Sequence, residues 1–125
     1  MKKLYFICLL ALAGCAYHNP LDKAGLRFQT LNTPPYVLSS WYRVDEEGAP
    51  LTVYVEKEQI DDEQRDAAVA DKSKNVAYLA RPCQYFQTDA CDINMDTQKE
   101  KKSIQKAIRQ LQKKANTDTV VVKGL

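Results

Sequence analysis

The feature that most constrains the fold of this chain is the alternation of apolar and helix-forming segments in its second half. Short apolar segments lie at 51–56, 75–80 and 120–122. A charged stretch at 61–72 and an amphipathic stretch at 97–115 separate them. Strands that alternate with helices are typical of a parallel sheet, in which each helix connects two parallel strands by a right-handed crossover. The pattern predicts an α/β fold with a small, partly parallel sheet and two packing helices.

The stretch 97–115 is the clearest helix. Its apolar residues recur at helical spacing and form one stripe along a very polar segment, namely Ile104, Ala107, Ile108 and Leu111. Asp96 or Thr97 can cap this helix, and Glu100 stands in its first turn, where a negative charge is favourable. The basic runs at 99–102 and 113–114 are interpreted as a solvated helix face, with a binding patch as the alternative.

Strand signals dominate the first half of the chain. We expect strands at 25–31 and 36–44, interrupted by Pro34 and Pro35. A turn is expected at 46–50, because it contains glycine and proline. Since the strands at 36–44 and 51–56 flank this turn, they are predicted to form a β-hairpin that adds an antiparallel edge to the sheet.

The amino terminus reads as a processing signal. Lys2 and Lys3 precede an apolar stretch that is too short to span a bilayer. It ends in Leu12-Ala13-Gly14-Cys15, which resembles the lipobox of bacterial lipoproteins. This resemblance predicts a signal peptide at 1–14, a tether at 15–24 and a single small α/β domain at 25–125. An ordinary secretory signal and an uncleaved apolar helix are the alternatives.

The lipobox implies that Cys15 becomes the lipidated first residue of the mature protein. Its thiol would carry a diacylglyceryl group and its amine a further acyl chain, such as palmitate. Two or three chains anchor stably, because each buried methylene contributes about 0.8 kcal/mol. The partner is then the lipid bilayer of a bacterial cell membrane. Ala16 follows Cys15 where an aspartate commonly signals inner-membrane retention, so the outer membrane is favoured if two membranes are present.

The charge balance argues against a nucleic-acid partner. Without Lys2 and Lys3, the 18 basic residues become 16 and balance the 16 acidic ones. Nucleic-acid-binding domains usually carry a clear basic excess.

Cysteine usage predicts a disulfide. Cys8 leaves with the signal peptide and Cys15 is acylated, so Cys83 and Cys91 remain in an oxidising compartment. Free thiols and a metal site are the alternatives. A metal site needs more ligands, and the only histidine, His18, is far away in the sequence. No metal and no cofactor are therefore predicted.

Several segments resemble the amino-terminal portion of an α/β-hydrolase-like bacterial lipoprotein family. The resemblance covers roughly 36–125 and is carried by Leu51–Glu56, by Asn75–Tyr85, by the helix from Thr97 and by Thr119–Lys123. It implies a truncated α/β-hydrolase-like sheet, with Cys91 at a plausible position to pair with Cys83. The residues after Glu56 lack the family's glycine-containing loop, and the 125 residues contain no Gly-x-Ser-x-Gly nucleophile elbow.

No catalytic residues are predicted, because a serine triad needs a histidine in reach and His18 lies on the tether. We expect a non-catalytic, membrane-anchored lipoprotein of the cell envelope: a hydrolase remnant, or a structural or interaction protein with an envelope protein as possible partner. One alternative is half of a split serine hydrolase that another chain completes. The other is an envelope binding module, with aromatic anchors such as Trp41, Tyr42 or Tyr85.

Overall fold

The computed structural model describes residues 19–57, 61–83 and 97–124. In chain order, the elements are α2 (Pro20–Lys23), β1 (Arg27–Thr33), β2 (Tyr36–Val44), β3 (Leu51–Val55), α3 (Asp62–Ala70), β4 (Asn75–Leu79), α4 (Thr97–Ala115) and β5 (Val120–Lys123). The bounds of β2 and α4 are those predicted from the sequence.

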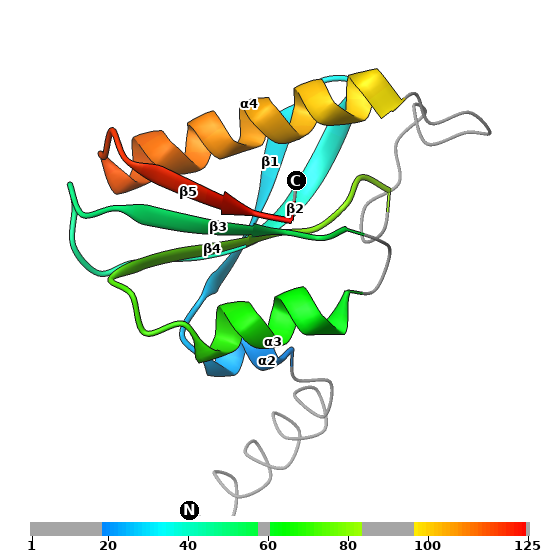
Figure 1. Cartoon of the computed structure of the whole chain (residues 1–125). Helices are drawn as coiled ribbons and strands as arrows, with labels where there is room; N and C mark the ends of the chain where they lie inside the picture. The colour runs from blue at the N-terminus through cyan, green and yellow to red at the C-terminus, as the bar shows by residue number, and fades with distance from the viewer. Residues whose placement is uncertain (1–18, 58–60, 84–96, 125) are drawn as a thin grey trace, which may run out of the picture.

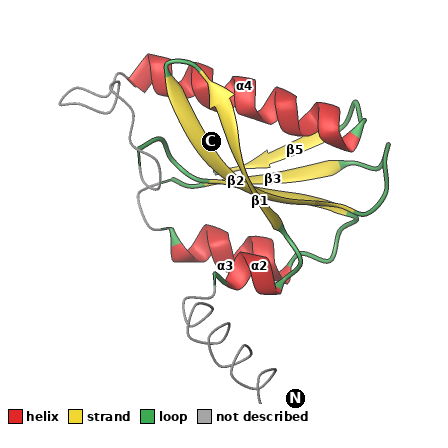
Figure 2. Ribbon diagram, turned by 180° about the vertical axis from the view of Figure 1, so that it is seen from behind, coloured by secondary structure: helices red, strands yellow, loops and turns green. Residues whose placement is uncertain are grey.

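The strands form one mixed sheet in the order β1-β2-β4-β3-β5 (Figures 1 and 2). β2 is antiparallel to both β1 and β4, whereas β3 is parallel to both β4 and β5. This arrangement confirms the predicted fold class: a mixed α/β domain with an amino-terminal hairpin, parallel pairs and helices packed on the sheet.

Helices cover both faces of the sheet. α4 lies on one face, and α2 and α3 lie side by side on the other (Figure 1). Because strand side chains alternate between faces, β3 directs Val53 toward the α4 core and Tyr54 toward the α2–α3 core. The predicted stripe of α4 is buried at Ile104, Ala107 and Leu111.

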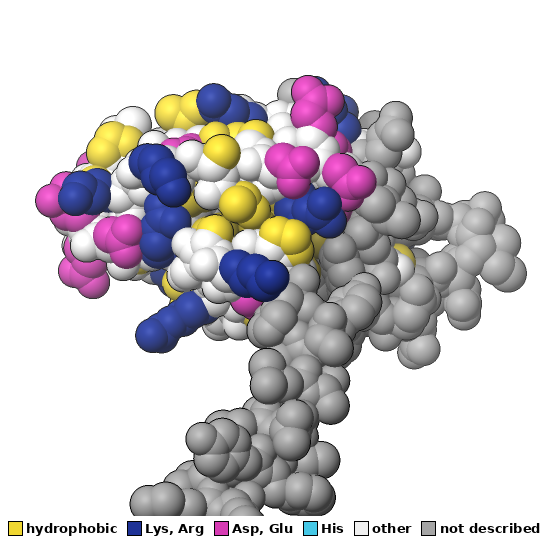
Figure 3. Space-filling model, turned by 90° about the horizontal axis from the view of Figure 1, so that it is seen from below, with side chains coloured by type: hydrophobic (Ala, Val, Ile, Leu, Met, Phe, Trp, Pro, Cys, Tyr) yellow, Lys and Arg dark blue, Asp and Glu magenta, His cyan; other side chains and the backbone are white. Residues whose placement is uncertain are grey.

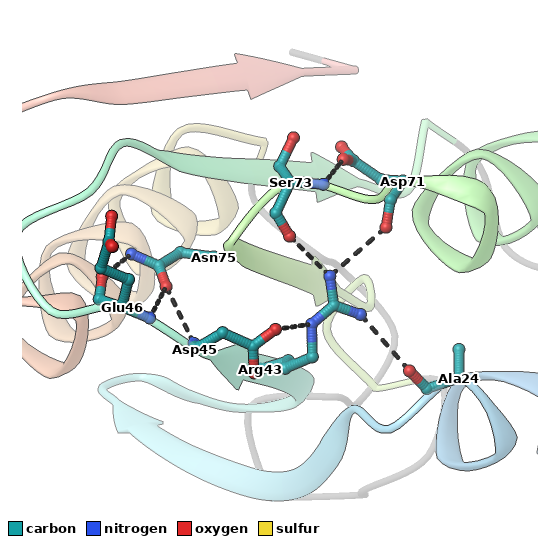
Figure 4. A network of polar contacts seen from close by, with 7 residues as sticks. All are labelled: Ala24, Arg43, Asp45, Glu46, Asp71, Ser73 and Asn75. Carbon is teal, nitrogen blue, oxygen red and sulfur yellow. Dashed lines mark hydrogen bonds and ion pairs between the residues drawn. The ribbon is translucent and has the colours of Figure 1, made fainter.

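The amino-terminal hairpin consists of β1 and β2, so the predicted pairing of 36–44 with 51–56 is wrong. β2 folds back on β1 through the Pro34-Pro35 turn, and β4 lies between β2 and β3. The segment 45–49 connects β2 to β3 and crosses the start of β4. The buried side chain of Asn75, at this start, holds the segment in place (Figure 4). Its Oδ1 accepts from the amides of Asp45 and Glu46 at 3.1 and 3.2 Å. Its Nδ2 donates to the carbonyls of Glu46 and Ala49 at 2.8 and 2.9 Å.

The segment expected to be a tether contributes a helix to the domain. Asn19 caps α2 by accepting from the Leu21 amide at 2.9 Å, and Pro20 occupies the first turn. Leu21 is 1% exposed and belongs to the α2–α3 core. The first strand therefore begins later than expected, at Arg27.

Arg43 joins three segments beside this helix (Figure 4). Its guanidinium donates to the carbonyl of Ala24 at 3.3 Å and to that of Ser73 at 2.7 Å. Its Nε also forms an ion pair with Asp45 at 2.9 Å. The end of α2, the end of β2 and the loop before β4 are thereby held together.

Candidate functional site

A cavity of about 200 Å³ lies where the carboxyl ends of β3, β4 and β5 meet the start of α4. β3 leads to α3 on one face of the sheet, whereas β4 precedes α4 on the other face. Open α/β sheets bind ligands at such a switch point, outside the carboxyl ends of the strands. The described residues that line the cavity are Val55, Glu56, Arg81, Thr97, Glu100, Lys101, Ile104 and Gly124.

Glu56, directly after β3, is the most buried charged residue of the site, with 2% of its surface exposed. One carboxylate oxygen accepts from the Arg81 amide at 2.7 Å, and the other accepts from the Tyr78 hydroxyl at 2.5 Å. A buried carboxylate is tolerated only when its oxygens are hydrogen-bonded. Glu56 therefore fixes the chain after β4 to the end of β3.

The side chain of Arg81 connects the strand ends to α4. One of its nitrogens donates to the Lys57 carbonyl at 2.5 Å, and another forms an ion pair with Glu100. Glu100 is only 5% exposed, so its carboxylate faces the interior rather than solvent. Removing Arg81 would leave a buried charge without this partner, which is more costly than losing a surface ion pair.

The floor of the site is closed by contact between the ends of β3 and β5. The side-chain amide of Gln64, on α3, donates to the backbone carbonyls of Val55 and Lys123 at 2.9 and 3.0 Å. Gly124 has a φ of +99°, and a Cβ there would lie 2.1 Å from the Val55 carbonyl oxygen. Only glycine fits this position, because its backbone is left-handed and any Cβ would collide with Val55.

A second polar cluster lies on the α3 face of the sheet. The Tyr54 hydroxyl donates to Asp71 at 2.7 Å. Burial raises the pKa of Tyr54 to about 12, and the hydrogen bond and negative charge of Asp71 add to this shift. For Asp71, burial opposes the charged form, but hydrogen bonds from Ser73 and Tyr54 overcome it and lower the pKa. The pair is a protonated phenol bound to a carboxylate.

The side chains that line the cavity can bind a small polar group but form no recognised catalytic arrangement among the described residues. They provide two carboxylates, one guanidinium, one ammonium and the hydroxyl of Thr97. In the same ranges, no group of three or more histidine, cysteine, aspartate or glutamate residues is placed to hold a metal ion.

The predicted site residues lie mostly outside this cavity. Cys15 and Cys91 fall outside the described residues, so lipidation and the disulfide stay predictions. Cys83 is half-buried after β4 and packs against the α4 core. Trp41 is 4% exposed and makes tilted ring contacts with Phe28 and Tyr78, whose ring centroids lie 5.0 and 6.0 Å away, so it is a core residue rather than a surface anchor.

The other two predicted aromatic anchors, Tyr42 and Tyr85, stay predictions. Tyr42 is partly buried, and the ammonium of Lys114 lies 5.4 Å from its ring centre. Tyr85 falls outside the described residues.

The cluster of Glu56, Arg81 and Glu100 was not predicted as a unit. A signal was present, since Glu56 ends the predicted strand segment 51–56, Arg81 directly follows the segment 75–80, and parallel strands end at the same edge of a sheet. Glu100 stands in the first turn of α4, as expected, and its buried carboxylate also forms an ion pair with Arg81.

Across the described ranges, no helix has both the length and the apolar character needed to cross a bilayer. Comparison with known protein families, with characterised proteins and with solved structures found no match to this chain.

Proposed function

We propose that this chain is a lipid-anchored protein of the bacterial cell envelope whose domain binds a partner polypeptide by adding a strand at β5. The anchor rests on the lipobox-like segment that ends at Cys15. The first described helix begins at Pro20, so the folded domain follows this cysteine closely. The bilayer is the first partner, held through acyl chains on Cys15, and the outer membrane is favoured where two membranes exist.

The observation that carries the binding role is the edge position of β5. Among the described residues, β5 pairs with β3 alone and ends the sheet. Val120 and Val122 pack against the α4 core, whereas Val121 is 46% exposed. An apolar edge strand is a template for pairing with another chain, and natural proteins usually protect such edges. Strand addition at an edge is also a common mode of peptide recognition.

The hydrogen-bond pattern shows which groups of β5 face outward. The Leu51 amide donates to the Thr119 carbonyl at 3.0 Å, and Leu51 lies opposite Val120. In a parallel ladder, alternate residues bond to the same neighbouring strand. The Val121 amide therefore faces β3, whereas the amides of Val120 and Val122 point away from it. These two amides are the donors that an added strand would use.

Residue-level hydrogen exchange tests this proposal. In the purified full-length chain, the amides of Val120 and Val122 should exchange rapidly, and the Val121 amide should be protected as an internal control. In the native envelope, all three should be protected. Protection of Val120 and Val122 in the purified chain would mean that the chain covers its own edge. Rapid exchange in the envelope would mean that no strand is added; either result contradicts the proposal.

A second candidate is half of a split serine hydrolase. It is favoured by the position of the cavity beside the loop that follows β3, because the hydrolase resemblance would place an oxyanion site there. The completing chain would supply the serine and the histidine. A fluorophosphonate probe should then label that companion chain only after it is mixed with this protein. Equal labelling of the companion chain by itself would refute this candidate.

A further inference from the structure

The exposed side of α4 carries a straight row of positive charge. Five exposed basic residues follow one another at intervals of three and four, which places them on one narrow arc of the helix: Lys99, Lys102, Lys106, Arg109 and Lys113. We call them the basic row. At a rise of 1.5 Å per residue, the row is about 21 Å long.

The row is not balanced by acidic residues of its own helix. Glu100 is the only acid in α4, and it is buried against Arg81. Within the described residues, Lys102, Arg109 and Lys113 form no ion pair. One carboxylate is near, since Asp118 lines the same surface depression as Arg109 and Lys113. The row therefore keeps a clear positive excess.

The opposite side of the domain has a different character. Viewed from below, basic and acidic side chains are intermixed on the α2–α3 face (Figure 3). α3 itself contributes Asp62, Glu63 and Asp66, and Arg65 lies near two of these carboxylates. The positive excess along the row is therefore local to α4, since the opposite face mixes both signs of charge and the formal net charge of the whole chain is only +2.

The position of the row also bears on its partner. The described chain begins at Asn19, on the α2–α3 face, and the sheet separates this face from α4. Only four residue steps separate Asn19 from Cys15, a reach of at most about 14 Å. If Cys15 is acylated, as proposed above, the α2–α3 face is the one tied to the bilayer. The basic row then faces away from the anchoring membrane.

The composition of the row argues against a second bilayer as its partner. Helices that bind membrane surfaces insert an apolar face below their basic residues. The apolar stripe of α4 is instead buried against the sheet. A row without apolar side chains, whose neighbouring Cβ atoms lie about 5–6 Å apart, is suited to an extended chain of anionic groups.

We infer that the basic row binds a linear anionic polymer of the cell envelope, on the side of the domain away from its lipid anchor. The polymer lies along α4 and pairs its anionic groups with successive basic side chains. Binding depends on salt, because the polymer releases counterions as the row neutralises it. This role adds to the strand-binding role proposed for β5 and uses a different surface.

The test measures binding of long-chain inorganic polyphosphate to the full-length protein in neutral phosphatidylcholine vesicles. The variant K102Q/R109Q/K113Q removes three charges from the row. The control K23Q/K72Q/K74Q removes three exposed charges elsewhere. We expect the row variant to bind at least about tenfold more weakly, with a salt slope lower by about 3. The control should stay within about twofold of the native protein.

Three outcomes would overturn the inference. Equal losses in both triple variants would mean that net charge, not the row, attracts polyanions. If the row variant bound polyphosphate with the affinity of the native protein, the row would not be the binding surface. Row-dependent binding to vesicles with anionic phospholipid, without binding to polyphosphate, would assign the row to a membrane. Failure of the protein to insert into vesicles would count against the lipid anchor alone, because polyphosphate binding is also measured in detergent.

Discussion

Replacing Asn75 by alanine should destabilise the domain strongly, because one side chain holds the connection between β2 and β3. Asn75 is completely buried and makes four hydrogen bonds to the 45–49 segment. A typical hydrogen bond contributes about 1 kcal/mol net, and a buried group left without a partner costs about 1–3 kcal/mol. Since 45–48 is exposed, water can satisfy part of the freed backbone.

We therefore expect Asn75→Ala to lower the free energy of unfolding by about 2–4 kcal/mol. This loss corresponds to a fall in melting temperature of about 10–30 °C for a domain of this size. It is a large fraction of a total stability of about 5–15 kcal/mol. Asn75→Asp keeps the accepting oxygen but sets a carboxylate oxygen against the carbonyls of Glu46 and Ala49. It should cost at least as much at neutral pH.

Urea unfolding of the full chain, followed through the fluorescence of Trp41, measures this change. Trp41 is the only tryptophan and is 4% exposed, so its emission reports loss of the core. Asn32→Ala is the matched control, because Asn32 is an exposed asparagine on β1. It should change stability by less than about 0.5 kcal/mol. A loss below about 1 kcal/mol in Asn75→Ala would refute the reasoning that this side chain organises the crossing.

Three further predictions follow from the structure. Gly124→Ala should lower the free energy of unfolding by at least about 2 kcal/mol in chemical denaturation, because its Cβ would collide with the Val55 carbonyl; unchanged stability would mean that the two strand ends do not meet as described. If Cys83 and Cys91 are paired, reduction should cost about 2–3 kcal/mol and lower the melting temperature, and an unchanged temperature would argue against the bridge. The pKa of Tyr54 is about 12 in the folded chain against 10.0 when unperturbed, so the contribution of its hydroxyl to the free energy of unfolding is complete below pH 10 and is lost as the pH rises toward 12. Denaturation measured across this pH range should show a smaller alkaline loss of stability in Tyr54→Phe. Identical pH profiles of the two proteins would contradict the raised pKa of Tyr54.

The sequence was sufficient for elements whose pattern is local. The helix at 97–115 was predicted with correct bounds because its apolar spacing fits only a helix. The strand at 36–44 was also correct, since its aromatic and β-branched residues favour extended backbone. The short helix at 20–23 was missed, although Asn19 followed by Pro20 is a recognised helix start.

Strand pairing could not be predicted in the same way, because it depends on contacts between distant segments. The strands at 36–44 and 51–56 are adjacent in the sequence, and a hairpin is the simplest expectation for such neighbours. Asn75 instead binds the intervening turn and places β4 between them. The inward pairing of Glu100 with Arg81 is another long-range contact without a local signal.

The mass of the protein extracted from its native membranes tests the central claim, the lipid anchor on Cys15, most directly. The account predicts a chain that begins at Cys15, with two or three acyl chains added through the thiol and the amine of that residue. An unmodified Cys15 thiol on a chain that still carries residues 1–14 would contradict it.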